Sequence, residues 1–508
     1  MSSPISTPSP DPKRWLVLFA VMLAFLPVVL DMTILHIAVP RLTQALSANN
    51  TQMLWIIDIY PLLMAGLLVP MGTLADRVGN RRIMLIGLTI FGAASGLAAF
   101  APNTAMLIAA RMLLAVGGAM IMPCVLGIIR RTFEDDAERA MALGLWGMVG
   151  AAGAAMGPLV GGALLEHFWW GSVFLINVPL MLIVAPICFV LLPRVEETTP
   201  SPWPIGQAIL LILGMISVVY GIKAGFGASH TLSVTVLTIT LGIVLLSVFA
   251  RMQLRSATPM LDLTLFSHPA IVAGMIMAMI TIGALAGVQL TLAQELQYVL
   301  DKTPLQAGIF MIPIMAAAAI GGPIAGRLFN LFGLRPVACL SLIITAAALA
   351  GLAFSDFNHP GFLVPAQLAV LGLTLSIGLT ASSIAIMGSV EASKGGAAGS
   401  LEATSYELGT GLGITLFGVF MSSAFARAML PPPDLAPDLA LQAARSIGDT
   451  YLVAAQLSAD QGAALIEAGK AAFTTTHTLL LSTSAGMIGL LGVVVFFLLA
   501  NYKDISTT

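Results

Sequence analysis

Charged residues are scarce in this 508-residue chain. Lysine, arginine, aspartate and glutamate together make up 9% of it, whereas hydrophobic residues make up 58%. A water-soluble protein of this length needs far more charge to cover its surface. The scarcity excludes a soluble globular protein and indicates that most of the chain lies in a lipid bilayer.

Cysteine and excess positive charge are also scarce. The three cysteines, Cys124, Cys188 and Cys339, lie in apolar runs, which argues against a disulfide framework or a zinc site. The net charge of -2 leaves no basic surface for nucleic acid. The sequence contains no H-x-x-x-H, no C-x-x-C and no nucleotide-binding loop. We therefore expect no metal site, no cofactor and no enzyme activity.

Long apolar runs fill most of the chain. A helix needs roughly 20 apolar residues to cross the hydrocarbon core. Cutting the sequence at charged, proline-rich and glycine-rich breaks gives fourteen candidate spans. Six lie in residues 1–193, two in 194–268 and six in 269–508. The spans fall at about 15–39, 53–74, 83–100, 105–129, 140–165, 173–192, 205–224, 232–250, 270–292, 305–329, 337–354, 362–390, 400–425 and 478–500.

Lysine and arginine predict the orientation of these spans. If the N-terminus is cytoplasmic, the inner segments hold most of the basic residues, and the short outer loops hold only Arg41, Lys223 and Lys302. This asymmetry agrees with the positive-inside rule. We therefore expect both termini in the cytoplasm and a long outer loop at 426–476.

An acid interrupts the first span. Asp31 lies about 12 Å along the helix from its end at Val39, at 1.5 Å per residue. An acid in the middle of a span costs roughly 2.5 to 3.5 kcal/mol and usually marks an ion or substrate pathway. Asp58 and Arg111 reach comparable depths in other spans, and a buried arginine needs a partner. We expect these three residues to share the outer half of the first bundle. Two alternatives are that Asp31 is an acid at a helix end that water reaches, and that the arginine and an aspartate form a purely structural pair.

A ten-residue motif occurs twice in the chain. Residues 72–81 and 326–335 both read G-x-L-x-(D/N)-x-x-G-x-R, a tight glycine turn between two helices. The match aligns the first six spans with the last six and leaves the seventh and eighth as an insert. Two related six-helix bundles are an architecture of secondary transporters.

A second motif lies in the fifth span. Residues 153–162 read G-x-x-x-G-P-x-x-G-G. Glycines four apart let a neighbouring helix approach closely, and the proline kinks its own helix. Packing alone would explain the glycines, which are Gly153, Gly157, Gly161 and Gly162 around Pro158.

These strings resemble the major facilitator superfamily. The first copy of the turn is similar to the family's G-x-x-x-D-R-x-G-R-R loop, with Asn80 in place of a basic residue, and the fifth-span string is similar to the motif of its antiporters. Residues 30–34 (LDMTI) and 55–60 (WIIDIY) look like the fourteen-span drug:proton antiporters, and among these the quaternary ammonium and methyl viologen resistance pumps. The resemblance implies an all-α membrane protein of two six-helix bundles plus two inserted helices.

The resemblance also implies a function and roles for residues. The protein would be a proton-coupled antiporter that exports small lipophilic cations from the cytoplasm or the inner leaflet, and the proton gradient would replace any cofactor. Proton coupling would involve Asp31, Arg111 and Asp58, and gating would involve Gly72, Asp76, Arg77, Gly79 and Arg81. The substrate would meet Asp31, Glu407, Glu402, Trp55, Tyr60 and Tyr406, although Glu402 is as consistent with a residue that only faces water.

We expect this protein in the bacterial cytoplasmic (inner) membrane, as a monomer. Its ligands would be protons and lipophilic cations, and its surroundings the lipid bilayer. Two other readings are an exporter of an endogenous metabolite and an importer or sensor on the same fold, but an importer is expected to lack the fifth-span motif.

Overall fold

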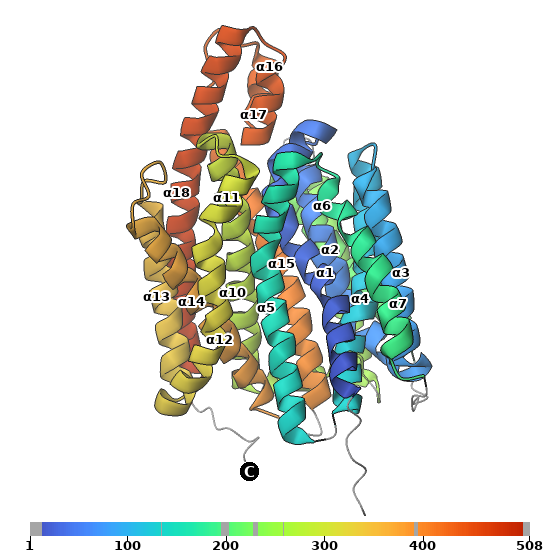
Figure 1. The fold of residues 1–508 in the computed structure, drawn as a ribbon. Helices are drawn as coiled ribbons and strands as arrows, with labels where there is room; N and C mark the ends of the chain where they lie inside the picture. Colours follow the sequence, from blue (N-terminus) through green and yellow to red (C-terminus); the bar gives the residue numbers. More distant parts are fainter. Residues whose placement is uncertain are drawn as a thin grey trace, which may run out of the picture.

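A computed structural model describes residues 13–133, 135–194, 203–226, 232–257, 259–390 and 395–500. None of these residues lies in a β-strand, and fourteen of the helices they form are long and apolar enough to cross a membrane. The helices stand side by side as an upright bundle (Figure 1). The predicted all-α fold with fourteen membrane helices is confirmed.

The first bundle is built from the N-terminal helices. Helix α1 packs on α5, α2 and α3 pack on α4, and α3 packs on α7. The predicted sixth span consists of two pieces, a single turn (α6) and the longer α7. The bounds are α1 Arg14–Leu46, α2 Asn50–Val78, α3 Asn80–Ala99, α4 Thr104–Thr132, α5 Asp136–His167, α6 Ser172–Leu175 and α7 Asn177–Leu191.

The second bundle repeats this packing. Helix α10 packs on α15, α12 on α14, and α13 on α18. The predicted tenth span is also in two pieces, α11 and α12, and α10 continues into a π-helical turn, η2. The bounds are α10 Pro269–Gln294, η2 Glu295–Val299, α11 Pro304–Phe310, α12 Ile312–Phe332, α13 Leu334–Ala353, α14 Leu363–Met387, α15 Gly395–Ala428 and α18 Ala459–Leu498.

Two further helices lie between the bundles in sequence. They are α8 (Ile205–Phe226) and α9 (Leu232–Arg255), followed by the 3-10 turn η1 (Leu263–Ser267). Helix α8 packs on α2 and α9 packs on α8. Few of the apolar side chains of α9 are buried, so this helix presents them to the surroundings.

The seam between the bundles is formed by matching pairs of helices. Helix α2 packs against α15, and α5 packs against α11 and α12. In each pair, the second span of one bundle meets the fifth span of the other. This exchange is the contact pattern expected for two bundles related by a repeat.

The repeated motif forms the same turn in both bundles. Gly79 joins α2 to α3 with φ 107°, and Gly333 joins α12 to α13 with φ 80°. Glycine adopts positive φ at no steric cost, whereas other residues rarely do. The predicted glycine turn is therefore confirmed at both copies.

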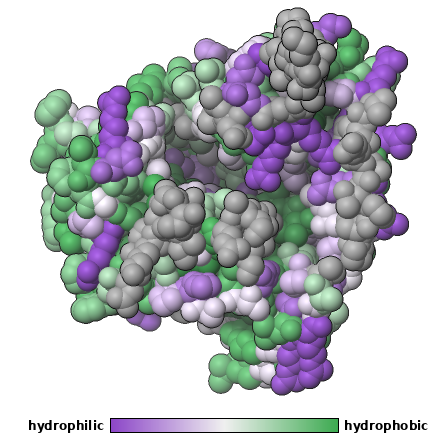
Figure 2. All heavy atoms as spheres, turned by 90° about the horizontal axis from the view of Figure 1, so that it is seen from below, coloured by the Kyte–Doolittle hydropathy of each residue, from purple (hydrophilic) through white to green (hydrophobic). Residues whose placement is uncertain are grey.

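The two ends of the molecule differ. We call the end where α1 begins and α18 ends the terminal face, and the opposite end the distal face. At the distal face the bundles touch, because Gln297 donates to the carbonyl oxygen of Ile37 at 3.0 Å. The terminal face is hollowed near its middle (Figure 2), so the bundles separate toward that side.

The long segment before the last span is largely helical. Helix α15 runs to Ala428, α18 already begins at Ala459, and two short helices lie between them, α16 (Pro437–Ala443) and α17 (Ile447–Ala454). The segment predicted as an outer loop, 426–476, therefore contains the end of α15, two short helices and the first turns of α18. Helix α18 projects beyond the other spans at the distal face, and α16 and α17 lie beside its projecting part (Figure 1).

Candidate functional site

Asp31 and Arg111 form a buried ion pair between α1 and α4. Arg111 Nη1 donates to Asp31 Oδ2, and both residues are 1% exposed. Arg111 Nε donates to the carbonyl oxygen of Ile56 at 3.1 Å, and the guanidinium lies 4.6 Å from the centroid of the Tyr60 ring. Asp31 Oδ1 has no hydrogen-bond partner among the described residues. Of the two partners predicted for Arg111, the structure places Asp31 on the guanidinium, and the Asn177 side chain also lies beside the Asp31 carboxyl.

Asp58 faces a different set of neighbours. Its Oδ2 lies 2.7 Å from Lys223 Nζ on α8 and accepts a hydrogen bond from Thr415 on α15 at 2.5 Å. Asp58 is fully buried and Lys223 is 4% exposed. Of the three residues expected in the outer half of the first bundle, Asp31 and Arg111 are therefore paired with each other, whereas Asp58 is paired with Lys223. The placement of Lys223 in an outer loop is wrong, because this lysine lies in the last turn of α8 and points into the protein.

Glu407 is the buried acid that the second bundle contributes. One turn after Glu407, helix α15 approaches α2 closely, since a Cβ atom at Gly411 would lie 3.0 Å from the Leu62 side chain. Glu407 is 4% exposed, and its Oε2 has no hydrogen-bond partner in the described part of the chain. Tyr60 on α2 lies within electrostatic range of both Glu407 and Asp31. Tyr60 is therefore a common neighbour of the buried acid of each bundle.

The other residues predicted to meet the substrate already contact groups of the protein. Tyr406 donates its hydroxyl to Glu402 at 2.6 Å, one helical turn earlier on α15. The ring centroid of Trp55 lies 3.7 Å from Lys223 Nζ. Trp55 therefore faces the inserted helix α8, and Glu402 and Tyr406 form a separate polar pair on α15.

The glycines of residues 153–162 bring α5 close to two helices. A Cβ atom at Gly157 would overlap the side chain of Thr33, so α5 fits tightly on the turn of α1 that contains Asp31. A Cβ atom at Gly162 would lie 2.6 Å from the carbonyl oxygen of Pro304, where α11 begins. The motif therefore links the helix of the buried acid to the seam with the second bundle.

The last arginine of the repeated motif makes the same contact in both bundles. Arg81 donates to the carbonyl oxygen of Phe189 at 2.7 Å, and its guanidinium lies 4.8 Å from that residue's ring centroid. Arg335 donates to the carbonyl oxygen of Phe496 at 2.9 Å, with its guanidinium 3.8 Å from the ring centroid. The two phenylalanines lie near the ends of α7 and α18, where carbonyl groups lack helical partners. Each arginine therefore holds the last helix of its own bundle.

The acid of the first copy lies at the same end of the molecule. Asp76 Oδ1 is 3.5 Å from Arg131 Nη2 on α4, and both side chains are exposed. Exposed ion pairs contribute little to stability. The contact stays within the first bundle, and the role of Asp76 and Arg81 in gating remains a prediction.

The family model of the Major Facilitator Superfamily matches residues 21–291, which is more than half of the chain. The chain belongs to the major facilitator superfamily. Two relatives in the superfamily cover nearly its whole length. The methyl viologen resistance protein SmvA of Salmonella typhimurium is 43% identical over 489 residues, covering 96% of this chain and 99% of that protein. The multidrug efflux pump LfrA of Mycolicibacterium smegmatis is 35% identical over 475 residues, covering 93% of each.

Solved transporter structures share the superfamily fold at low sequence identity. A bacterial homologue of the human lysosomal transporter Spinster, in an inward-facing and occupied conformation, aligns with a TM-score of 0.69 at 18% identity, over 97% of this chain and 98% of that one. A point mutant of the nucleoside transporter NupG aligns with a TM-score of 0.61 at 14% identity, over 96% and 100%. The resemblance to the superfamily, and within it to the methyl viologen resistance pumps, is confirmed.

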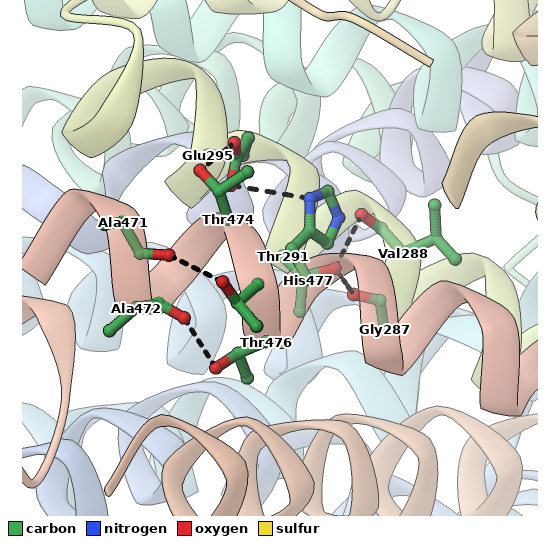
Figure 3. A network of polar contacts seen from close by, with 10 residues as sticks. Gly287, Val288, Thr291, Glu295, Ala471, Ala472, Thr474, Thr476 and His477 are labelled. Atoms are coloured by element: carbon green, nitrogen blue, oxygen red, sulfur yellow. Dashed lines mark hydrogen bonds and ion pairs between the residues drawn. The ribbon is translucent and has the colours of Figure 1, made fainter. Parts of the chain in front are cut away.

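This superfamily member holds a second buried polar cluster that the motifs did not indicate. Glu295, in the π-helical turn η2, accepts from Thr474 at 3.2 Å, and its other oxygen lies 3.5 Å from His477 Nδ1 on α18 (Figure 3). Glu295 is 2% and His477 3% exposed. Both residues lie just outside the predicted spans, and no motif includes them. Among the described residues, no group of three or more His, Cys, Asp and Glu side chains could hold a metal ion.

Proposed function

We propose that this protein is a proton-coupled antiporter that exports lipophilic cations, such as quaternary ammonium biocides, cationic dyes and viologens. The observation that carries the proposal is the Asp31 carboxylate, which is buried in mid-span and paired with Arg111 through one of its two oxygens. A carboxyl in this setting has two competing ligands, a proton and an organic cation. Competition of the two for a single negative charge is sufficient to couple their movements in opposite directions.

Glu407 supplies the second charge of the proposed site. It lies on the other bundle, within electrostatic range of Tyr60, and its Oε2, which accepts no hydrogen bond from the described residues, can act as a counter-charge for a substrate cation. We assign proton transfer to Asp31, because it has the arginine that can reset it, and substrate binding chiefly to Glu407. Tyr60 adds an aromatic face between them, although its ring already contacts the Arg111 guanidinium.

Relatives and packing support export. The names of the relatives SmvA and LfrA denote resistance and efflux. The glycines of residues 153–162, which resemble an antiporter motif, fit α5 to the helix of Asp31. In this proposal the terminal face is the cytoplasmic side of a bacterial inner membrane, and the hollow there admits the cation. The proton gradient is the energy source, no cofactor is required, and one chain is the working unit.

Proton release in inside-out membrane vesicles tests the function. The vesicles are acidified by respiration, and ethidium is then added outside. An antiporter moves ethidium inward and protons outward, so the fluorescence of a pH-sensitive dye reports that the lumen becomes less acidic. Vesicles without the protein are the control, and an equal response in both preparations, with the protein present by immunoblot, would refute proton-coupled export.

A further inference from the structure

Helix α8 of the insert is anchored to α2 at three levels. Trp203, just before α8, donates its indole N–H to the carbonyl oxygen of Pro70 at 3.1 Å. In the middle, a Cβ atom at Gly66 would overlap the side chain of Ile212. At the other end of α8 the contact is ionic, between Lys223 and the Asp58 carboxylate of α2. The insert is therefore fixed along one helix of the first bundle by a hydrogen bond, a close packing contact and a buried charge pair.

The buried charge pair has the composition of a binding site for organic cations. Lys223 Nζ lies 2.7 Å from Asp58 Oδ2 and 3.7 Å from the centroid of the Trp55 ring. Tyr220, one turn earlier on α8, flanks the indole with a centroid distance of 6.4 Å. A carboxylate and an aromatic face are the two groups by which proteins recognise ammonium ions, through charge and through the ring quadrupole.

We propose that Asp58 and Trp55 form an ammonium site whose resident ligand is the side chain of Lys223, supplied by the inserted helix. The ligand is part of the chain, so the site is occupied whether or not a substrate is bound. When the lysine side chain is shortened, the same site takes a free primary alkylammonium ion. This assigns a task to α8, which is to bring a compensating charge to an acid that the first bundle leaves unpaired.

The proposal separates the roles of the two aspartates in the first bundle. The only basic side chain that the structure places on the Asp58 carboxylate, among the described residues, comes from the insert, whereas Asp31 takes Arg111 from its own bundle. Asp58 also accepts from Thr415 of the second bundle. Its charge is neutralised where α2, α8 and α15 meet, and Asp58 is therefore a positioning residue that does not exchange protons or substrate.

Chemical rescue of the purified protein tests the site directly. Lys223→Ala removes three methylene groups and the ammonium, which together correspond to propylammonium. A buried carboxylate without its partner is strongly destabilising, so the unfolding temperature in detergent should fall on the order of 5 °C. Propylammonium chloride should restore most of that loss at millimolar concentration, whereas propanol, of similar size but uncharged, should not. Equal effects of the two compounds, or none from either, would overturn the ammonium site.

A double replacement tests the charge pair when a single variant is poorly folded. Lys223→Met and Asp58→Asn should each lower the unfolding temperature, and the double variant should recover most of it, because no buried charge is then unpaired. Lys470 and Asp301 form a pair at 2.5 Å in which the aspartate is exposed to solvent, and they serve as the control, with little change expected from Lys470→Met or Asp301→Asn. Additive losses in the Lys223 and Asp58 variants would contradict the proposal.

Transport by the double variant separates this inference from the proposed function. The pH dependence of ethidium export by the double variant should match that of the wild type at any overall rate, since Asp58 carries no proton in this scheme. A shifted pH profile would show that Asp58 exchanges protons and would overturn its role as a positioning residue. The unfolding measurements do not depend on transport, so they remain decisive if the wild-type protein exports no cation.

Discussion

Thr415 of α15 donates its hydroxyl proton to Asp58 Oδ2 of α2 at 2.5 Å, and this hydrogen bond crosses the seam between the two bundles. Both groups are buried. The bond lies on the side where the bundles are in contact, so it must break if α2 and α15 separate there. Together with the bond from Gln297 to Ile37, it stabilises the arrangement that is closed at the distal face.

Replacing this threonine should weaken the closed distal face. Thr415→Val keeps the shape of the side chain but removes the donor, at a cost of about 1 to 3 kcal/mol for a buried acceptor. The population open at the distal face should rise about 5- to 150-fold. Spin labels at the exposed positions Gln44 on α1 and Asp438 on α16 would report the longer distance. Thr410→Val is the matched control, because the hydrogen bond that the structure gives Thr410 goes to a carbonyl group of its own helix. Identical distance distributions in the two variants would contradict the role of Thr415.

Arg111 should tune the exchange at Asp31. The guanidinium favours the ionised carboxyl, so Arg111→Ala should slow efflux and move its pH optimum upward. Arg111→Lys should restore part of the rate but not all of it, since an ammonium cannot reproduce the fixed fork that bonds both Asp31 and the Ile56 carbonyl. Rates of ethidium efflux measured from about pH 6 to about pH 9, a range that includes neutral pH, would show the shift of the pH optimum. An unchanged pH profile at normal expression would make the arginine purely structural.

Glu407 should discriminate between substrates. Glu407→Gln removes the carboxyl that would pair with a substrate cation without changing the shape of the side chain, and charge-assisted contacts contribute about 1.5 to 3 kcal/mol. The affinity for a dication such as methyl viologen should fall about 10- to 150-fold, and the affinity for ethidium should fall less. Calorimetric titration of the purified variant gives both constants. Glu402→Gln is the control on the same helix, and equal losses in the two variants would remove the special role of Glu407.

Much of the architecture was readable from the sequence because a bilayer imposes a length on each helix. The fourteen spans and the glycine turns at Gly79 and Gly333 follow from hydrophobic length and backbone geometry alone. The pairing of buried charges does not follow from these. Depth along a helix gives only the axial position of Asp31 and Asp58, whereas the rotation of each helix decides that one faces α4 and the other faces α8 and α15.

Residues near span ends were the hardest to interpret. From the sequence, Lys223 is expected to be an ordinary positive charge in an outer loop. Its burial results from the packing of α8 against α2, which the sequence does not specify. Glu295 and His477 were missed because η2 and α18 extend beyond the apolar runs. A lysine or glutamate within one turn of a span end is therefore a residue for which the sequence leaves both a surface role and a buried role open.

The orientation in the membrane can be tested by cysteine labelling in intact cells. The three native cysteines are free and buried, so background labelling should be low. Ser458→Cys at the distal face should react with an impermeant maleimide, and Arg82→Cys at the terminal face should react only after the cells are opened. Both positions are exposed, whereas Asn80 is buried and unsuitable as a probe. The reverse pattern would invert the proposed topology.

The central claim is that Asp31 carries the proton that drives export, and Asp31→Asn tests it most directly. Purified protein is reconstituted into proteoliposomes, a proton gradient is imposed, and ethidium accumulation is followed with and without a protonophore. The wild-type protein should build an ethidium gradient that the protonophore collapses. Asp31→Asn should still bind ethidium, measured by fluorescence anisotropy, but should build no gradient. An ethidium gradient in the Asp31→Asn variant that the protonophore abolishes would contradict the assignment of Asp31 as the proton carrier.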